Sequence, residues 1–263
     1  MTILPYQNYG LFFAFVETRF LLPERRPFLG INELLLIASV FVIYGSVLLF
    51  YRFFGEAGLF AFTVFATITA NIEVLILVEA FGMEMTLGNI LFASTFLVTD
   101  ILSETRGKAT AKKAVYLGIA VSVVFILISQ SWLFYSPAVL DFISPSIREV
   151  FSHTPRMMIS GLLVYLIVQL FDVWVYHRWW DFTTKRFGEK DRFLWLRNNA
   201  ATLMSQLINA VLFNLAAFWG TYDGKTLMYI ILSTFIIYVF TTVADTPFVY
   251  LARKIDREKR MPV

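Results

Sequence analysis

The stretch RNNAATLMSQLINAVLFNLAAFW, residues 197–219, is apolar enough to sit in a lipid bilayer, yet its first half is rich in hydrogen-bonding side chains. These side chains belong to Arg197, Asn198, Asn199, Thr202, Ser205, Gln206 and Asn209. Lipid cannot hydrogen-bond, so polar groups at membrane depth must face other protein or a water-filled cavity. The stretch therefore predicts one helix of a bundle whose polar faces point inward.

The composition of the whole chain agrees with a membrane bundle. The chain has 263 residues, of which 58% are hydrophobic and 16% charged, and 28 are Phe. Such a composition is far from that of an ordinary soluble domain. There is no cysteine, which excludes disulfides, thiolate nucleophiles and cysteine-ligated metals. The net charge of +3 fits basic cytoplasmic loops beside anionic lipid better than it fits nucleic-acid binding.

Seven apolar windows approach the roughly 20 residues that a helix needs to cross a bilayer. They cover residues 32–53, 58–81, 86–102, 113–135, 156–177, 198–220 and 226–252. We expect an all-α polytopic membrane bundle over residues 32–254, with about seven transmembrane helices. Residues 1–31 are too short and too charged in their apolar part to span, which favours an interfacial segment. Residues 255–263 are expected to form a basic cytoplasmic tail.

The Lys and Arg residues predict the orientation of this bundle. With seven spans, 16 of the 22 basic residues fall on the side of the C-terminus and 6 on the side of the N-terminus. Basic residues gather in cytoplasmic loops. We therefore expect the N-terminus outside and the C-terminus in the cytoplasm.

Polar side chains recur at helical spacing in several windows, so each window presents one polar face. The third carries Asn89 and Asp100, the fifth Tyr165, Gln169, Asp172 and Tyr176, the seventh Thr234, Tyr238, Thr241 and Asp245, and the second Thr63, Thr67 and Asn71. Ser and Thr at such positions are more often contacts between helices. Buried carboxylates are costly, so Asp100 and Asp172 are better explained by function. For Asp245, two residues before Pro247, a structural role at a kink and a functional role are equally favoured.

Carboxylates, amides and aromatic rings around one cavity suit a flat polar heterocycle. A carboxylate accepts hydrogen bonds from a ring N–H and a neighbouring amino group, an amide both donates and accepts, and an aromatic ring stacks on the face. These groups would bind a guanine-like ligand, and they are equally compatible with many other small polar ligands.

Sequence patterns of catalysis are missing. The chain contains no HExxH, GxSxG, P-loop or GxGxxG pattern. We therefore expect a protein that is not an enzyme and that needs no cofactor or metal.

Four blocks of the chain resemble the queuosine precursor transporter family, a branch of the vitamin uptake transporters. They are LGNILFASTFLVTDILSETRGKATAKKAV (87–115), VYLIVQLFDVWVYH (164–177), LRNNAATLMSQLINAVLFNLAAFWG (196–220) and ADTPFVYLARK (244–254). The resemblance implies a core like the six-helix substrate-binding subunits of energy-coupling importers, with one extra N-terminal helix. It also implies a multi-pass protein of the inner (plasma) membrane that imports 7-deazaguanines for tRNA modification.

Carried onto this chain, the family pattern adds to the residues found above. The expected substrate-binding residues are Asp172, Gln169, Asp100, Asn71, Gln206, Asn209, Asn199, Asn198, Arg197 and Asn89. An alternative for Arg197 is neutralisation of Asp172 or Asp100.

The chain departs from the family pattern at two positions. Asn209-Ala210 stands where the family usually has Asp-Thr, and Tyr238 stands where related sequences often have Lys. Loss of both charges together is what removal of a buried ion pair would produce, and Asn209 and Tyr238 can still hydrogen-bond. These changes leave open import of a different small metabolite. A further alternative is a binding subunit that needs an ATP-driven partner, and a homo-oligomer is also compatible with the sequence.

Overall fold

The computed structural model describes residues 30–152, 155–188 and 194–260. The interfacial segment predicted for residues 1–31 lies outside these residues except for its last two. The end of the predicted tail, residues 261–263, also lies outside them. Residues 255–260 continue the last helix without a break.

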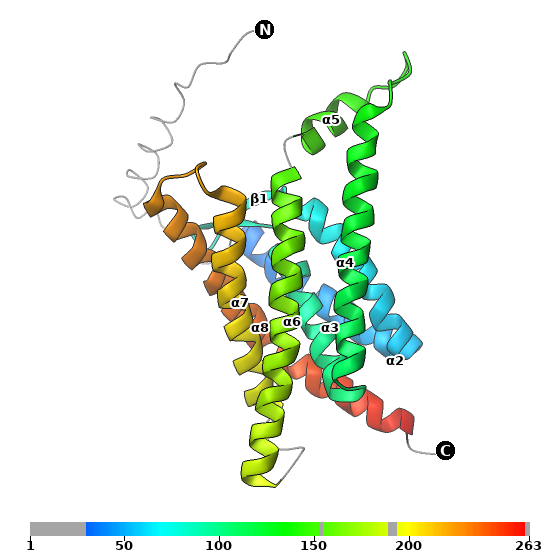
Figure 1. Cartoon of the computed structure of the whole chain (residues 1–263), viewed down its shortest axis with the longest axis vertical. Helices are drawn as coiled ribbons and strands as arrows, with labels where there is room; N and C mark the ends of the chain where they lie inside the picture. Colours follow the sequence, from blue (N-terminus) through cyan, green and yellow to red (C-terminus); the bar gives the residue numbers. More distant parts are fainter. Residues whose placement is uncertain (1–29, 153–154, 189–193, 261–263) are drawn as a thin grey trace.

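The chain forms a bundle of long helices (Figure 1). In chain order the elements are α2 (Ile31–Glu73), β1 (Leu77–Ala80), β2 (Met83–Thr86), α3 (Asn89–Thr105), α4 (Lys108–Ser131), the short 3-10 helix η1 (Trp132–Phe134), α5 (Ser144–Ser152), α6 (Pro155–Phe187), α7 (Leu194–Phe218) and α8 (Gly224–Arg260). Each of the seven apolar windows overlaps one of the long helices, and the first two windows share α2.

Helix α2 consists of two limbs that meet at Gly55. Gly55 has φ 62° and ψ −138°, a backbone conformation that glycine adopts at no steric cost. Gly58, one turn later, lies so close to the first limb that a Cβ atom there would sit 2.1 Å from the Phe50 carbonyl oxygen. The chain folds back at this point. As a result, Asn32 near the start of α2 donates to the carbonyl of Glu79, which lies beyond the end of α2, at 2.8 Å.

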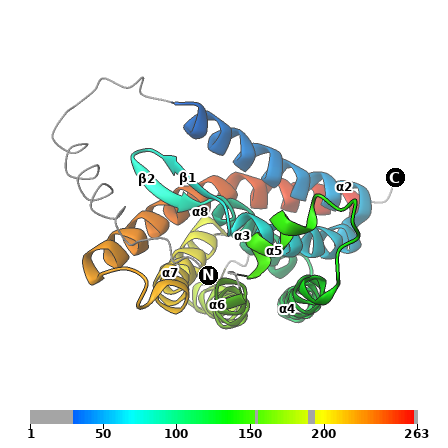
Figure 2. The ribbon, with the colours of Figure 1, turned by 90° about the horizontal axis from the view of Figure 1, so that it is seen from above.

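The second limb ends earlier than the apolar window predicts. The window runs to residue 81, but the helix ends at Glu73 and Leu77–Ala80 form β1, which pairs antiparallel with β2. Phe81 and Gly82 make the turn with positive φ values of 53° and 71°. Glu33 holds the turn by accepting the Phe81 N–H at 2.7 Å. The hairpin lies over one end of the bundle (Figure 2).

Helix α3 is the centre of the bundle. It packs against α2, α4, α6 and α8, and 15 of its 17 residues are buried. The neighbouring helices surround it in the end-on view (Figure 2). Because no side of α3 faces outward, its polar side chains must be matched by polar groups on its neighbours.

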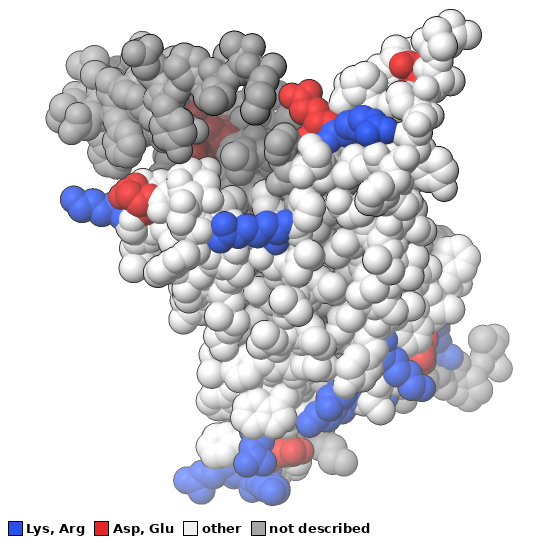
Figure 3. Space-filling view, turned by 45° about the horizontal axis from the view of Figure 1, so that its top comes forward, with Lys and Arg blue, Asp and Glu red and all other residues white. Residues whose placement is uncertain are grey.

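The surface has the charge distribution of a membrane protein. Among the described residues, five helices are long and apolar enough to cross a membrane: α2, α4 with η1, α6, α7 and α8. Charged side chains gather toward the two ends of the molecule, with a broad uncharged band between them (Figure 3). The protein is therefore a helical membrane bundle, as the sequence predicts.

Candidate functional site

A cavity lies between the helices near the end of the bundle that carries the β-hairpin. Its volume is about 70 Å³, several times the roughly 10–15 Å³ that one water molecule needs. The amide-bearing residues Asn71, Asn89 and Asn209 line it. The other lining residues are Thr67, Ala70, Val74, Thr86, Gly88, Phe92, Thr95, Ser122, Met157, Gly161, Leu162, Tyr165, Phe213 and Tyr238. The wall thus combines uncharged polar groups with aromatic rings.

One side of the cavity is a row of hydrogen-bonded polar groups. Asn209 donates through Nδ2 to the Tyr238 hydroxyl at 2.9 Å, and that hydroxyl lies 3.3 Å from Asn89 Oδ1. Thr86 donates to the same oxygen of Asn89 at 2.9 Å. The hydrogen bond predicted between Asn209 and Tyr238 is therefore present. The row offers both donors and acceptors to a ligand without carrying a charge.

The opposite side is formed by α2, α4 and α6. Asn71 Nδ2 donates to the Thr67 carbonyl at 2.8 Å and lies 3.4 Å from the Ser122 hydroxyl oxygen. The ring of Tyr165 packs edge-on against Phe92, with ring centroids 5.9 Å apart. Phe92 and Tyr165 therefore supply flat apolar surfaces beside the polar groups, as stacking on a planar heterocycle requires.

Gln169 forms the layer next to the cavity. Its Nε2 donates to the hydroxyl of Thr95, which lines the cavity, at 2.6 Å, and its Oε1 lies 3.3 Å from the Thr99 hydroxyl. Both the Gln169 and the Thr95 side chains are buried. This floor layer, Thr95, Thr99 and Gln169, separates the cavity from the carboxylates beyond it.

Asp100, Asp172 and Asp245 lie beyond the floor layer and do not line the cavity. Thr202 donates to Asp100 at 3.1 Å, and Asn198 donates to Asp245 at 2.7 Å. Each of the three carboxylates is at most 1% exposed. The predicted contact of Asp100 and Asp172 with a ligand stays a prediction.

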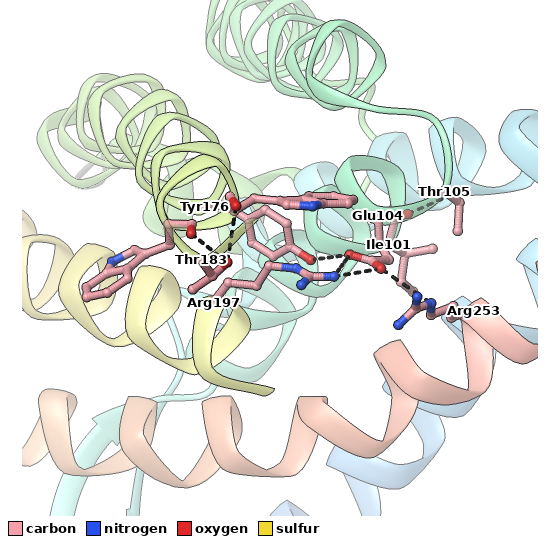
Figure 4. Close-up of polar contacts among 9 residues, drawn as sticks. Ile101, Glu104, Thr105, Tyr176, Thr183, Arg197 and Arg253 are labelled. Carbon is pink, nitrogen blue, oxygen red and sulfur yellow. Dashed lines mark hydrogen bonds and ion pairs between the residues drawn. The ribbon is translucent and has the colours of Figure 1, made fainter. Parts of the chain in front are cut away.

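A cluster of charged residues closes the bundle farther on. We call Glu104, Tyr176, Arg197 and Arg253 the ion-pair cluster (Figure 4). Both carboxylate oxygens of Glu104 accept from Arg197 at 2.7–2.8 Å, Tyr176 donates to Glu104 at 2.9 Å, and Arg253 Nε lies 3.4 Å away. The Arg197 guanidinium also lies over the Trp180 ring, 4.3 Å from its centroid.

Arg197 is fully buried, and its carboxylate partner is Glu104. The alternative that it neutralises Asp172 or Asp100 stays a prediction. Glu104 lies one turn beyond Asp100 on α3, and sequence spacing alone does not distinguish the two acids. The structure distinguishes them by their depth in the bundle. Arg197 lies in the first turn of α7, at the end of the bundle far from the cavity, where Glu104 also lies.

The remaining predicted residues of α7 are spread along the helix. Asn199 donates to the Thr246 hydroxyl at 2.7 Å near the ion-pair cluster, whereas Gln206 accepts a 3.4 Å contact from Asn209. Of the ten predicted residues, Asn71, Asn89 and Asn209 thus lie on the cavity, and Gln169 lies in its floor layer. Asn198, Asn199 and Arg197 lie toward the other end.

Several cavity residues carry little signal in the sequence. Tyr238 stands out only as a member of a polar face and as a departure from the family pattern, and Ser122 was not among the predicted residues. A weak signal for Ser122 exists, since it shares a helix face with Ser129 seven residues on. Thr86 lies before α3, where helical periodicity gives no information. Among the described residues, no group of three His, Asp or Glu side chains is arranged to hold a metal ion.

Comparison with known proteins agrees with this architecture. A family model described as "Putative vitamin uptake transporter" matches residues 86–252, which run from the hairpin through α3 to α8. The chain belongs to this family. A relative from Bacillus subtilis (strain 168), named "Probable queuosine precursor transporter", is 37% identical over 208 residues. That match covers 79% of this chain and 89% of the relative. The resemblance expected from the four sequence blocks is therefore confirmed.

The family match includes Asp100, Asp172, Asp245 and most of the cavity, because of the cavity residues only Asn71 and three near it in the chain lie before residue 86. No solved structure gives a significant match to this member of the vitamin uptake transporter family. The description of this family names transport and no catalytic activity.

Proposed function

We propose that the protein imports 7-deazaguanine precursors of queuosine, such as the 7-cyano or 7-aminomethyl base or queuine, across the inner (plasma) membrane. The observation that carries the proposal is the uncharged polar cavity in a chain 37% identical to a relative named as a transporter of queuosine precursors. Such a ligand is a flat heterocycle with donors and acceptors around its edge.

The cavity can meet both parts of such a ligand. Asn71, Asn89 and Asn209 approach from three different helices, and each amide can donate and accept. Phe92, Phe213 and Tyr165 provide rings for the face of the heterocycle. In this proposal the amides bind the edges of the base, and Gln169 marks the inner limit of the cavity.

The orientation that we propose fits import through this cavity. In this proposal the chain crosses the membrane seven times, counting each limb of α2 as one span. One extra helix precedes the six-helix core, and the C-terminus lies in the cytoplasm. The hairpin end then faces outside. The excess of basic residues at the other end supports this orientation. The cavity would therefore open toward the outside and the ion-pair cluster would lie on the cytoplasmic side.

The proposal is tested in a host that cannot make 7-deazaguanine and lacks its own importer. The base is supplied at low concentration, and queuosine in tRNA is measured with and without this protein. We expect queuosine to appear only when the protein is present. If none of the three bases restores it while the protein is found in the membrane, the proposal is wrong. Restoration that requires an ATPase module of the host would instead assign the chain as a substrate-binding subunit.

A matched pair of tyrosines tests the cavity itself. Tyr238→Phe removes a buried hydroxyl that lines the cavity, whereas Tyr51→Phe removes a buried hydroxyl that donates to Asp256 at 2.8 Å far from it. Tyr238→Phe loses the 2.9 Å hydrogen bond from Asn209 and the longer 3.3 Å contact with Asn89, whereas Tyr51→Phe loses the bond to Asp256. A hydrogen bond of this kind is worth about 1 kcal/mol. We expect Tyr238→Phe to raise the concentration for half-maximal uptake about five- to tenfold, a factor that corresponds to such a bond. Equal effects of the two variants on uptake would place the ligand elsewhere.

A further inference from the structure

Three carboxylates from three different helices lie together in the interior. Asp100 comes from α3, Asp172 from α6 and Asp245 from α8. Helix α7 contacts two of them one turn apart, because Thr202 donates to Asp100 and Asn198 donates to Asp245, and Ser205 on the same helix lies beside Asp172. Among the described residues, none of the three is part of an ion pair. We call these three residues the carboxylate triad.

The hydrogen bonds of the triad are incomplete. One oxygen of Asp100 has no hydrogen-bond partner among the described residues, and neither oxygen of Asp172 has a well-formed one. The Ser205 hydroxyl beside Asp172 donates to the Ala201 carbonyl. The Nε2 amide of Gln206, also fully buried, has no acceptor in the same part of the chain. The interior therefore contains polar groups whose partners are supplied by something other than these side chains.

Charged and titratable groups around the triad do not provide a counter-charge. Arg197 from α7 and Arg253 from α8 contact Glu104, and Tyr176 from α6 donates to the same acid. Tyr44 from α2 points its hydroxyl at the Thr241 carbonyl, 3.4 Å away. An isolated carboxylate in a medium without water is strongly disfavoured and takes up a proton instead. A metal ion is a poor alternative, because the described acids are not arranged as a metal site.

The triad lies deeper in the bundle than the cavity. Asp172 follows Gln169 by three residues on α6, which is about 4.5 Å along the helix axis. Glu104 follows Asp100 by four residues on α3, about 6 Å farther on. The triad thus lies between the floor layer of the cavity and the ion-pair cluster. A group bound to the triad would pass from one side of the membrane to the other if the floor layer and the ion-pair cluster opened in turn.

We propose that the carboxylate triad is a proton-binding site and that import of the heterocycle is driven by protons entering with it. This inference rests on the proposed function. Protons reach the triad from the cavity side when the floor layer opens, and the neutral acids permit the closed state seen here. Opening of the ion-pair cluster admits cytoplasmic water and frees Arg197, and the protons leave to the cytoplasm. Asp172 is the central residue, because it has the fewest partners.

The test uses the full-length protein in proteoliposomes with the radiolabelled 7-cyano base and a clamped membrane potential. An acid-outside difference of one pH unit should raise accumulation about tenfold for each coupled proton. A protonophore should abolish the effect, and a sodium gradient at equal pH should not replace it. Equal accumulation with and without the pH difference would overturn the proposal.

Asp172→Asn separates coupling from substrate binding. We expect this variant to exchange labelled for unlabelled base at equal pH but to lose the response to the pH difference. Asp256→Asn, a buried acid outside the triad that pairs with Arg106 at 2.7 Å, should keep that response. Loss of exchange as well would assign Asp172 to the heterocycle instead of the proton. A retained tenfold response would also refute its role.

Infrared spectroscopy tests the site without any transport. The wild-type protein near neutral pH should show the carbonyl band of a protonated carboxylic acid, and Asp172→Asn should weaken it. If Asp172→Asn does not fold, Asp100→Asn and Asp245→Asn serve the same comparison. Absence of the band in the wild-type protein would overturn the proton site. A protein that shows the band but exchanges none of the three bases would refute the proposed substrate and leave the proton site in place.

Discussion

At the scale of single residues, Gly118 shows how one missing side chain shapes the cavity. A Cβ atom at Gly118 on α4 would lie 2.5 Å from the Tyr165 hydroxyl oxygen, which is too close for a real contact. Tyr165 lines the cavity from α6. The glycine therefore allows α4 to approach this ring, and the position of the ring sets the width of the cavity.

Gly118→Ala should impair uptake by pushing the Tyr165 ring toward the cavity. We expect uptake at low substrate concentration to fall about tenfold, a factor that corresponds to roughly 1.4 kcal/mol. Gly118→Ala combined with Tyr165→Phe should recover part of this loss, because the nearest atom is then removed. Failure of the second change to restore any uptake would argue against a steric effect through this hydroxyl.

The pair of Arg197 and Glu104 is the most buried ion pair among the described residues, with side chains 0% and 3% exposed. Removal of one partner leaves the other charge buried and typically costs 3–5 kcal/mol. We expect Arg197→Met to lower the free energy of unfolding in detergent by about this amount. Arg197→Met combined with Glu104→Gln should cost less than the sum of the two single changes.

Arg106→Met is the matched control for this pair. Arg106 also pairs with acids, Asp256 and Glu56, but its side chain is 29% exposed. Solvent screening reduces the value of such contacts, so its loss should be clearly smaller. Equal losses for Arg106→Met and Arg197→Met would show that burial does not set the strength of the ion-pair cluster.

At the scale of elements, the two limbs of α2 depend on Gly58. Gly58→Ala puts a Cβ atom 2.1 Å from a backbone oxygen of the first limb, so the limbs must separate. We expect a loss of about 1–3 kcal/mol, the usual cost of overpacking, measured as the free energy of unfolding in detergent. Gly45→Ala, in open space on the same helix, should be neutral or stabilising by up to about 1 kcal/mol. A larger loss of stability for Gly45→Ala than for Gly58→Ala would contradict the close contact at the bend.

Hydropathy predicts the helices well but not the ends of all of them. Leu77–Ala80 are apolar enough to continue the window before them, yet they pair with Met83–Thr86 across the turn at Phe81 and Gly82. Likewise, helical periodicity assigns Gln169 and Asp172 to one inward face. It does not give depth relative to other helices. The separation of the cavity from the carboxylate triad therefore appears only when the helices are packed.

The neutral row in the cavity could be predicted in part, for a physical reason. An acid and a base lost together leave groups of similar size that can still hydrogen-bond, and Asn209 and Tyr238 do so. Ser122 and Thr86 complete the wall, but Thr86 lies before α3 and the pair Ser122 and Ser129 is a weak periodic signal. Their place in the site depends on tertiary contacts alone.

At the scale of the whole molecule, orientation can be measured directly because the chain has no cysteine. A single cysteine can replace Lys225 or Lys185, which are both exposed and lie at opposite ends of the bundle. Labelling then reports on that position alone. With the hairpin end outside, Lys225→Cys should react with a membrane-impermeant maleimide in intact cells. Lys185→Cys should react only after the membrane is opened. The opposite labelling pattern would reverse the proposed direction of the cavity.

The burial of α3 also constrains how the protein is made. Its 17 residues extend roughly 26 Å, less than the approximately 30 Å of a bilayer core, and they include Asn89, Asp100 and Glu104. Alone in lipid, such a segment would be a poor candidate for release from the translocon. It becomes stable only when its neighbours surround it. We therefore expect α3 to become stable in the membrane only after α6 and α8, which pack against it, have been synthesised.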